Sequence, residues 1–147
     1  MSEKATHSKK QSGQSLVELA ISLVLILTLL AGIVDLGMAF FSWVALRDAS
    51  QEGAIYGAVC PNNANAIVAR VRDVSNTPVN LADTGLVTVN VVTASGIAPG
   101  NPIEITVIFD YQSITPGLSG FLPNGGFITL QASTTNTILT TTNSSCP

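Results

Sequence analysis

Hydrophobic residues are concentrated in one block near the N-terminus, between Leu16 and Leu46. Residues 19–34 carry no formal charge and include six Leu, three Ile and two Val. At about −0.3 to −0.6 kcal/mol each, these side chains together favour membrane insertion by roughly 3–7 kcal/mol. Because a bilayer requires roughly 20 residues of helix, we predict a transmembrane segment over approximately residues 16–38.

The helix is predicted to continue well beyond this segment. No proline occurs before Pro61, so we expect one helix over residues 14–59. Its second half is amphipathic, with apolar or small residues at steps of three and four that would share one face: Leu36, Ala39, Trp43, Leu46, Ala49, Gly53 and Tyr56. Another part of the protein must pack against this apolar face to shield it from water, and the C-terminal domain is the obvious candidate. The spacing of Gly53 and Gly57 fits either a helix–helix contact or close packing under a sheet.

The remaining residues, 60–147, are predicted to form a small α+β domain with about three strands. A short helix is expected over residues 62–74. Alternating or Val-rich segments separated by turn residues predict strands over residues 86–93, 103–111 and 127–135. No crossover helix separates the last two, which favours an antiparallel sheet. The predicted fold class is therefore α+β, with a long N-terminal helix, transmembrane in its first half, packed against this sheet.

The amount and the distribution of charge limit where the protein can be located and what it can bind. Only 10% of the 147 residues are charged and the net charge is −3, which argues against a nucleic-acid partner. Lys4, Lys9 and Lys10 precede the apolar block, and the next basic residue is Arg47. This distribution predicts a single-pass protein of the plasma membrane, with a cytoplasmic N-terminus and an extracytoplasmic C-terminal domain.

Residues 1–13 form a short, polar, basic leader, for which three interpretations compete. A cleaved secretory signal would use the small residues around Gly37-Met38-Ala39 as its cleavage site. An uncleaved signal anchor needs no further feature. The third interpretation, a prepilin, is favoured by Gly13 at the end of the leader and Glu18 five residues later.

In the prepilin interpretation, a prepilin peptidase cuts between Gly13 and Gln14 on the cytoplasmic side and leaves the apolar helix attached. Glycine has no side chain, so the backbone can approach the peptidase closely. The carboxylate of Glu18 would then pair with the new N-terminal ammonium of a neighbouring subunit, because an unpaired charge in an apolar setting is costly. The alternative is that Glu18 simply extends to the membrane surface.

Asp35 is the second acidic residue of the apolar block, and two interpretations are open. It could mark the outer membrane boundary, solvated by lipid headgroups. It could instead pair with another subunit across a helix bundle and contribute to assembly, as Glu18 would.

The residues with catalytic or metal-binding chemistry are few. Two cysteines and the single His7 do not make a metal site. If the C-terminal part lies outside the cytosol, Cys60 and Cys146 can form a disulfide closing a loop of 87 residues, worth roughly 4–5 kcal/mol in the chain-entropy model; the alternative is two unrelated thiols. No nucleophile elbow or phosphate-binding loop is present. We therefore expect no enzyme activity, cofactor or small-molecule substrate.

Three short elements of the helix stand out together: residues 13–18, 32–37 and 49–54, which read GQSLVE, GIVDLG and ASQEGA. In their order and spacing they resemble the TadE-like family, pseudopilins of tight-adherence (Flp-type) pilus systems. The chain departs from the family pattern at Leu19, where an aromatic residue is usual, and at Gln51, where arginine is frequent.

The resemblance implies a pilin-like fold and a structural component made as a prepilin. Its expected partners are the membrane, a prepilin peptidase and other pseudopilins or pilus-assembly proteins, either in the membrane or in a surface filament. The alternative function is a single-pass, membrane-anchored binding or adhesion module with no filament role.

Overall fold

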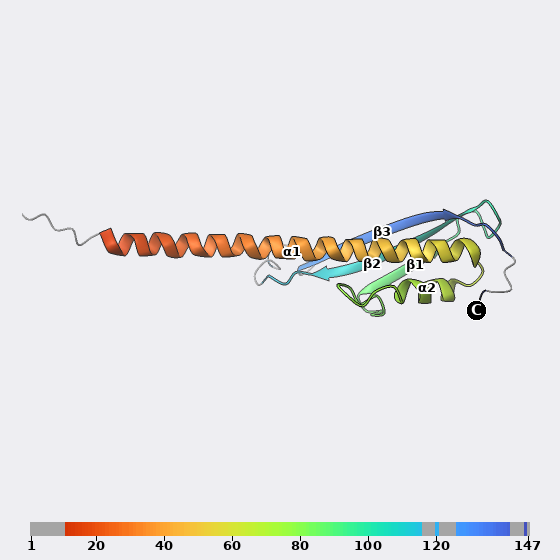
Figure 1. Cartoon of the computed structure of the whole chain (residues 1–147), viewed down its shortest axis with the longest axis horizontal. Coiled ribbons are helices and arrows are strands. Elements are labelled where there is room, and N and C mark those ends of the chain that lie inside the picture. The colour runs from red at the N-terminus through yellow and green to blue at the C-terminus, as the bar shows by residue number, and fades with distance from the viewer. Residues whose placement is uncertain (1–10, 116–119, 121–125, 142–145, 147) are drawn as a thin grey trace, which may run out of the picture.

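The computed structural model of the chain describes residues 11–115, 120, 126–141 and 146. In chain order the elements are α1 (Gln11–Val59), α2 (Ala64–Arg72), β1 (Val87–Val92), β2 (Pro102–Gln112) and β3 (Phe127–Thr137). Figure 1 shows α1 as a long rod whose first half stands free, while the sheet and α2 pack along its second half. This arrangement confirms the predicted α+β fold class.

Helix α1 begins slightly earlier than predicted. Of the predicted leader, residues 1–10 lie outside the described residues, and α1 starts at Gln11 rather than at Gln14. Gly13 and Gln14 therefore lie in the first turn of the helix. Within the described part of the chain, α1 is the helix that is long and apolar enough to cross a membrane, which fits a single-pass membrane protein.

The three strands form one antiparallel sheet in the order β1-β2-β3. The alternation predicted for β2 is present: Ile103, Ile105 and Val107 are fully buried on the face toward the helices. On the opposite face, Glu104 and Asp110 are exposed and accept hydrogen bonds from hydroxyl groups of β3. One face of the sheet thus covers the helix, and the other faces solvent.

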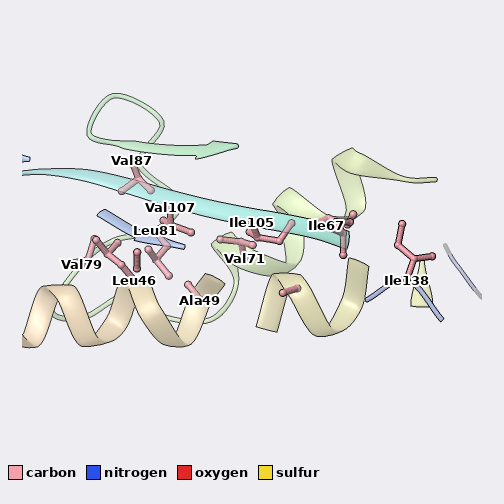
Figure 2. Packing of buried hydrophobic residues seen from close by; sticks show 13 residues of the cluster. Leu46, Ala49, Ile67, Val71, Val79, Leu81, Val87, Ile105, Val107 and Ile138 are labelled. Atoms are coloured by element: carbon pink, nitrogen blue, oxygen red, sulfur yellow. The ribbon is translucent and has the colours of Figure 1, made fainter. Parts of the chain in front are cut away.

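The hydrophobic core lies between α1, α2 and this sheet (Figure 2). Leu46 and Ala49 contribute from α1, Ile67 and Val71 from α2, and the side chains of β2 close the core from the sheet side. Val79 and Leu81, in the segment between α2 and β1, fill the end of the core beside Leu46. The second half of α1 is therefore part of the hydrophobic core of the C-terminal domain.

The buried face of α1 differs from the predicted one at its membrane end. Leu36, predicted to start the covered face, is 73% exposed, whereas Asp35 and Ser42 are buried. From Leu46 onward the prediction is correct, since Leu46, Ala49 and Gly53 are buried. The physical reason is that Asp35 and Ser42 share the face of α1 that packs against the domain, whereas Leu36 lies about 100° around the helix from Asp35 and is left uncovered.

Gly53 and Gly57 mark the closest approach between α1 and the rest of the domain. A Cβ atom added at Gly53 would collide with Cγ2 of Val71 and lie 3.2 Å from Cγ2 of Ile105. A Cβ atom at Gly57 would lie 2.8 Å from Cδ1 of Ile103. The GxxxG spacing therefore serves packing under α2 and the sheet, the second of the two interpretations offered by the sequence.

We expect Gly53→Ala to lower the free energy of unfolding by about 1–3 kcal/mol, because the added methyl group overpacks the contact with Val71. Gly37→Ala is the matched control: no atom lies within 4 Å of the Cβ position at Gly37. There alanine should leave stability unchanged or raise it by up to about 1 kcal/mol through its helix propensity. Urea denaturation in detergent, followed by Trp43 fluorescence, measures both values; equal effects would contradict the close approach at Gly53.

Candidate functional site

Asp35 is a buried carboxylate at the centre of a group of hydrogen bonds between α1 and the end of β2. Its side chain is 5% exposed. Its Oδ1 accepts hydrogen bonds from the backbone N–H of Ile114 at 2.8 Å and from the hydroxyl of Tyr111 at 3.1 Å, while Oδ2 accepts one from the backbone N–H of Thr115 at 2.9 Å. We call this arrangement of Asp35, Tyr111, Ile114 and Thr115 the Asp35 clasp.

The clasp joins residues almost eighty positions apart in sequence. It holds the end of β2 and the residues just after it against α1, at the point where the helix leaves the domain. Because Phe127 pairs with Gln112, the start of β3 is held at the same level. The membrane end of the sheet, near the middle of α1 in Figure 1, is therefore fixed to the helix by one carboxylate.

This geometry corrects the first interpretation of Asp35. The carboxylate is not solvated at a boundary; it is buried and accepts three hydrogen bonds from its own chain. Such bonds meet the cost of burying a charged group. The structure thus gives Asp35 an intramolecular role that neither interpretation included.

The clasp also affects Tyr111. Burial raises the pKa of the Tyr111 hydroxyl above its usual value, and the hydrogen bond to Asp35 and the negative charge of Asp35 raise it further. Tyr111 therefore stays protonated and keeps donating to Asp35 throughout the physiological pH range.

The partners of Asp35 were missed by the sequence reasoning. Ile114 and Thr115 donate through backbone N–H groups, which every residue type except proline possesses. Only Tyr111 offered a signal, since a hydroxyl at the end of a strand can reach a carboxylate. The presence of Asp35 in an apolar helix did indicate that its carboxylate has polar partners, because an unpaired acidic side chain is costly there.

The predicted processing and assembly residues lie at the other end of the apolar segment. Gly13, Gln14 and Glu18 are exposed, and Glu18 has no hydrogen-bond or ion-pair partner within the described residues. Glu18 and Asp35 are separated by the 16 residues 19–34, and their Cα atoms lie about 26 Å apart along α1. The structure therefore keeps the two acidic residues apart, one at each end of the uncharged run.

Cys60 and Cys146 form a disulfide, with Cα atoms 5.8 Å apart. Cys60 follows directly after α1, so the bond ties the end of the chain to the membrane-distal end of the helix. Neighbouring bonds support the same connection: the N–H of Leu139 donates to the carbonyl oxygen of Ala58 at 2.8 Å. The domain is thus fastened to α1 at both ends, by the Asp35 clasp and by the disulfide.

No feature of the described residues resembles a catalytic centre. A shallow hollow is lined by Asp48, Glu52, Arg70, Asp73 and Val74, and Arg70 there pairs with Glu52 at 2.7 Å. The lining of this hollow includes no Ser, Thr, Cys, Lys or His side chain, and thus none of the usual hydroxyl, thiol or amine nucleophiles. Among the described residues, no cluster of three or more His, Cys, Asp or Glu side chains is arranged to hold a metal ion.

Comparison with known proteins finds a family match for the N-terminal helix. Residues 13–54 match the family model described as TadE-like protein. No curated protein and no solved structure was found to match the chain. The matched segment covers Gly13, Glu18 and Asp35 and ends inside the part of α1 that the sheet covers. Over residues 13–54, less than a third of its length, the chain is therefore similar to the TadE-like family.

Proposed function

We propose that the protein is a structural, membrane-anchored pseudopilin that contributes to the assembly of a tight-adherence (Flp-type) pilus or a related secretion system. A prepilin peptidase removes residues 1–13 and exposes the amine of Gln14. The carboxylate of Glu18 then pairs with this amine on a neighbouring subunit. The C-terminal domain lies on the extracytoplasmic side of the plasma membrane.

The observation that carries the proposal is that the TadE-like match starts at Gly13, the last residue of the predicted leader, and includes Glu18 and the apolar helix. Two features of the structure support it. The apolar half of α1 is exposed on all sides, so it requires lipid or other helices around it. Glu18 is exposed in this region and is without a partner among the described residues, as expected for a carboxylate that pairs with another chain.

Asp35 receives a different role in this proposal. Its carboxylate already accepts three hydrogen bonds within the chain, which leaves little capacity for a second subunit. We therefore assign the contact between subunits to Glu18 rather than to Asp35.

Glu18→Gln is expected to reduce incorporation into pilus-assembly complexes by at least about tenfold, because a lost charge-assisted hydrogen bond corresponds to roughly 1.5–3 kcal/mol. The readouts are the fraction of protein cross-linked to other subunits in cell membranes and the intact mass of the isolated protein. The wild-type mass should correspond to a chain that begins at Gln14, with or without a methyl group. Asp48→Asn, a neutralised carboxylate on the exposed face of α1, is the matched control and should assemble normally.

A full-length wild-type mass together with normal assembly of Glu18→Gln would contradict the pseudopilin role. That outcome would favour the membrane-anchored binding module. A chain that begins at Phe40 would indicate a cleaved secretory signal and would remove the membrane anchor altogether.

A further inference from the structure

The uncharged part of α1 is too short to cross a bilayer alone. Residues 19–34, between Glu18 and Asp35, number 16 and span about 24 Å, whereas the hydrocarbon layer is about 30 Å thick. At least one of these acidic residues must therefore lie at the edge of the hydrocarbon layer. Asp35 can lie at this edge at low cost, because its carboxylate accepts hydrogen bonds from three donors of its own chain.

The clasp brings a second segment of the chain to this same level. Ile114, whose N–H donates to Asp35, has a side chain that is 64% exposed. Phe127 at the start of β3 is also partly exposed there. The membrane end of the domain thus presents large apolar side chains next to the point where α1 leaves it.

The neighbouring turns of α1 extend this apolar surface. Leu36, Phe40 and Phe41 are all exposed, and Phe40 packs against both Phe41 and Trp43. Tryptophan and tyrosine concentrate where a membrane protein passes through the bilayer surface, and Trp43 lies beside Phe40. The exposed apolar surface of the free half of α1 therefore continues onto the domain.

Charge is missing from this end of the domain. Apart from Asp35, residues 19–46 of α1 carry no charge, and neither do the described residues 111–115 and 126–133. The carboxylate of Asp110, beside Tyr111 in β2, is exposed on the sheet face that points away from the helices. A surface this apolar and uncharged is suited to lipid rather than to water.

We propose that the membrane end of the C-terminal domain is a second membrane-contacting surface, formed by Leu36, Phe40, Phe41, Ile114 and Phe127, and that it rests in the bilayer that α1 crosses. Its occupant is phospholipid, because the surface continues directly from the transmembrane segment. The Asp35 clasp sets its depth. The domain therefore has a fixed height and orientation on the membrane, which the flexible linker of an ordinary anchored module would not give it.

This inference rests on the membrane anchorage in the proposed function, and the test separates the two. In a Trp43→Phe background, a single tryptophan is introduced at Ile114, at Leu139 or at Leu27, and each protein is placed in nanodiscs with or without bromine-labelled phosphatidylcholine. Leu139 is the matched control because its side chain is 68% exposed but lies at the other end of the domain. Its backbone N–H donates to the carbonyl oxygen of Ala58, which is about 35 Å beyond Asp35 along α1.

Ile114→Trp is expected to be quenched by the brominated lipid at least about twofold more strongly than Leu139→Trp, because only the first position lies at the level of Asp35. Equal, weak quenching at both positions, with strong quenching of Leu27→Trp, would overturn the inference and leave the transmembrane segment intact. Equal, strong quenching at both would also overturn it, since the domain would then lie flat on the bilayer. Absence of quenching at Leu27→Trp would overturn the membrane anchorage itself.

Discussion

Asp35→Ala is expected to lower the free energy of unfolding of the C-terminal domain by roughly 3–5 kcal/mol, because three donors lose their acceptor and two of them are backbone N–H groups. Urea denaturation in detergent micelles measures the change. Trp43 is a suitable probe, since it is the single tryptophan of the chain and its Nε1–H donates to the carbonyl oxygen of Gln131 across the contact between α1 and β3.

Two further variants make this prediction specific. Tyr111→Phe removes one donor and leaves both backbone hydrogen bonds, so it should cost only about 1–1.5 kcal/mol. Asp48→Ala removes an exposed carboxylate from the same helix and should change stability by less than about 0.5 kcal/mol. Equal effects of Asp35→Ala and Asp48→Ala would refute the clasp.

Insertion into the membrane should respond in the opposite direction. A charged residue within an apolar segment opposes insertion by about 2.5–3.5 kcal/mol when it lies at the centre, and by less near the surface. The Asp35→Ala variant is therefore expected to insert into the membrane at least as well as the wild type, although the stability of its C-terminal domain is lower. A loss of both insertion and folding would indicate that Asp35 acts on the transmembrane segment instead.

The large elements of this protein could be predicted because each has a strong local pattern. The uncharged run of residues 19–34 predicted the apolar half of α1, and the alternation from Ile103 to Tyr111 predicted the central strand together with its buried face. The same patterns placed β3 correctly. Periodicity succeeds where one face of an element is covered along its whole length.

The prediction was incomplete at the membrane end of the C-terminal domain, around Asp35 and Leu36. Leu36 continues the apolar periodicity of α1, yet it is exposed, because the face that packs against the domain runs through Asp35 and Ser42, about 100° around the helix from Leu36. The clasp was missed for a related reason. Asp35 bonds backbone N–H groups of Ile114 and Thr115, and the sequence does not encode which distant backbone groups will be free to donate.

Breaking the Cys60–Cys146 disulfide is expected to lower the free energy of unfolding by about 4 kcal/mol, because the bond closes a loop of 87 residues in the unfolded chain. The folded state should survive. Ile138 is buried, and Nδ2 of Asn62 donates to the carbonyl oxygen of Thr141 at 2.9 Å, so the C-terminal segment stays attached. Urea denaturation of the Cys60→Ser/Cys146→Ser double variant, followed by Trp43 fluorescence, measures the loss.

Reductant provides the control and also a test of location. Wild-type protein in reductant should fall to the stability of the double variant, which itself should not respond; freed thiols without any loss of stability would contradict the prediction. Disulfides persist in oxidising compartments and are rare in the cytosol, so a maleimide gel shift on isolated membranes also reports where the domain lies. Thiols that react only after reduction agree with an extracytoplasmic domain. Two thiols that react at once would place the domain in the cytoplasm and reverse the proposed orientation of α1.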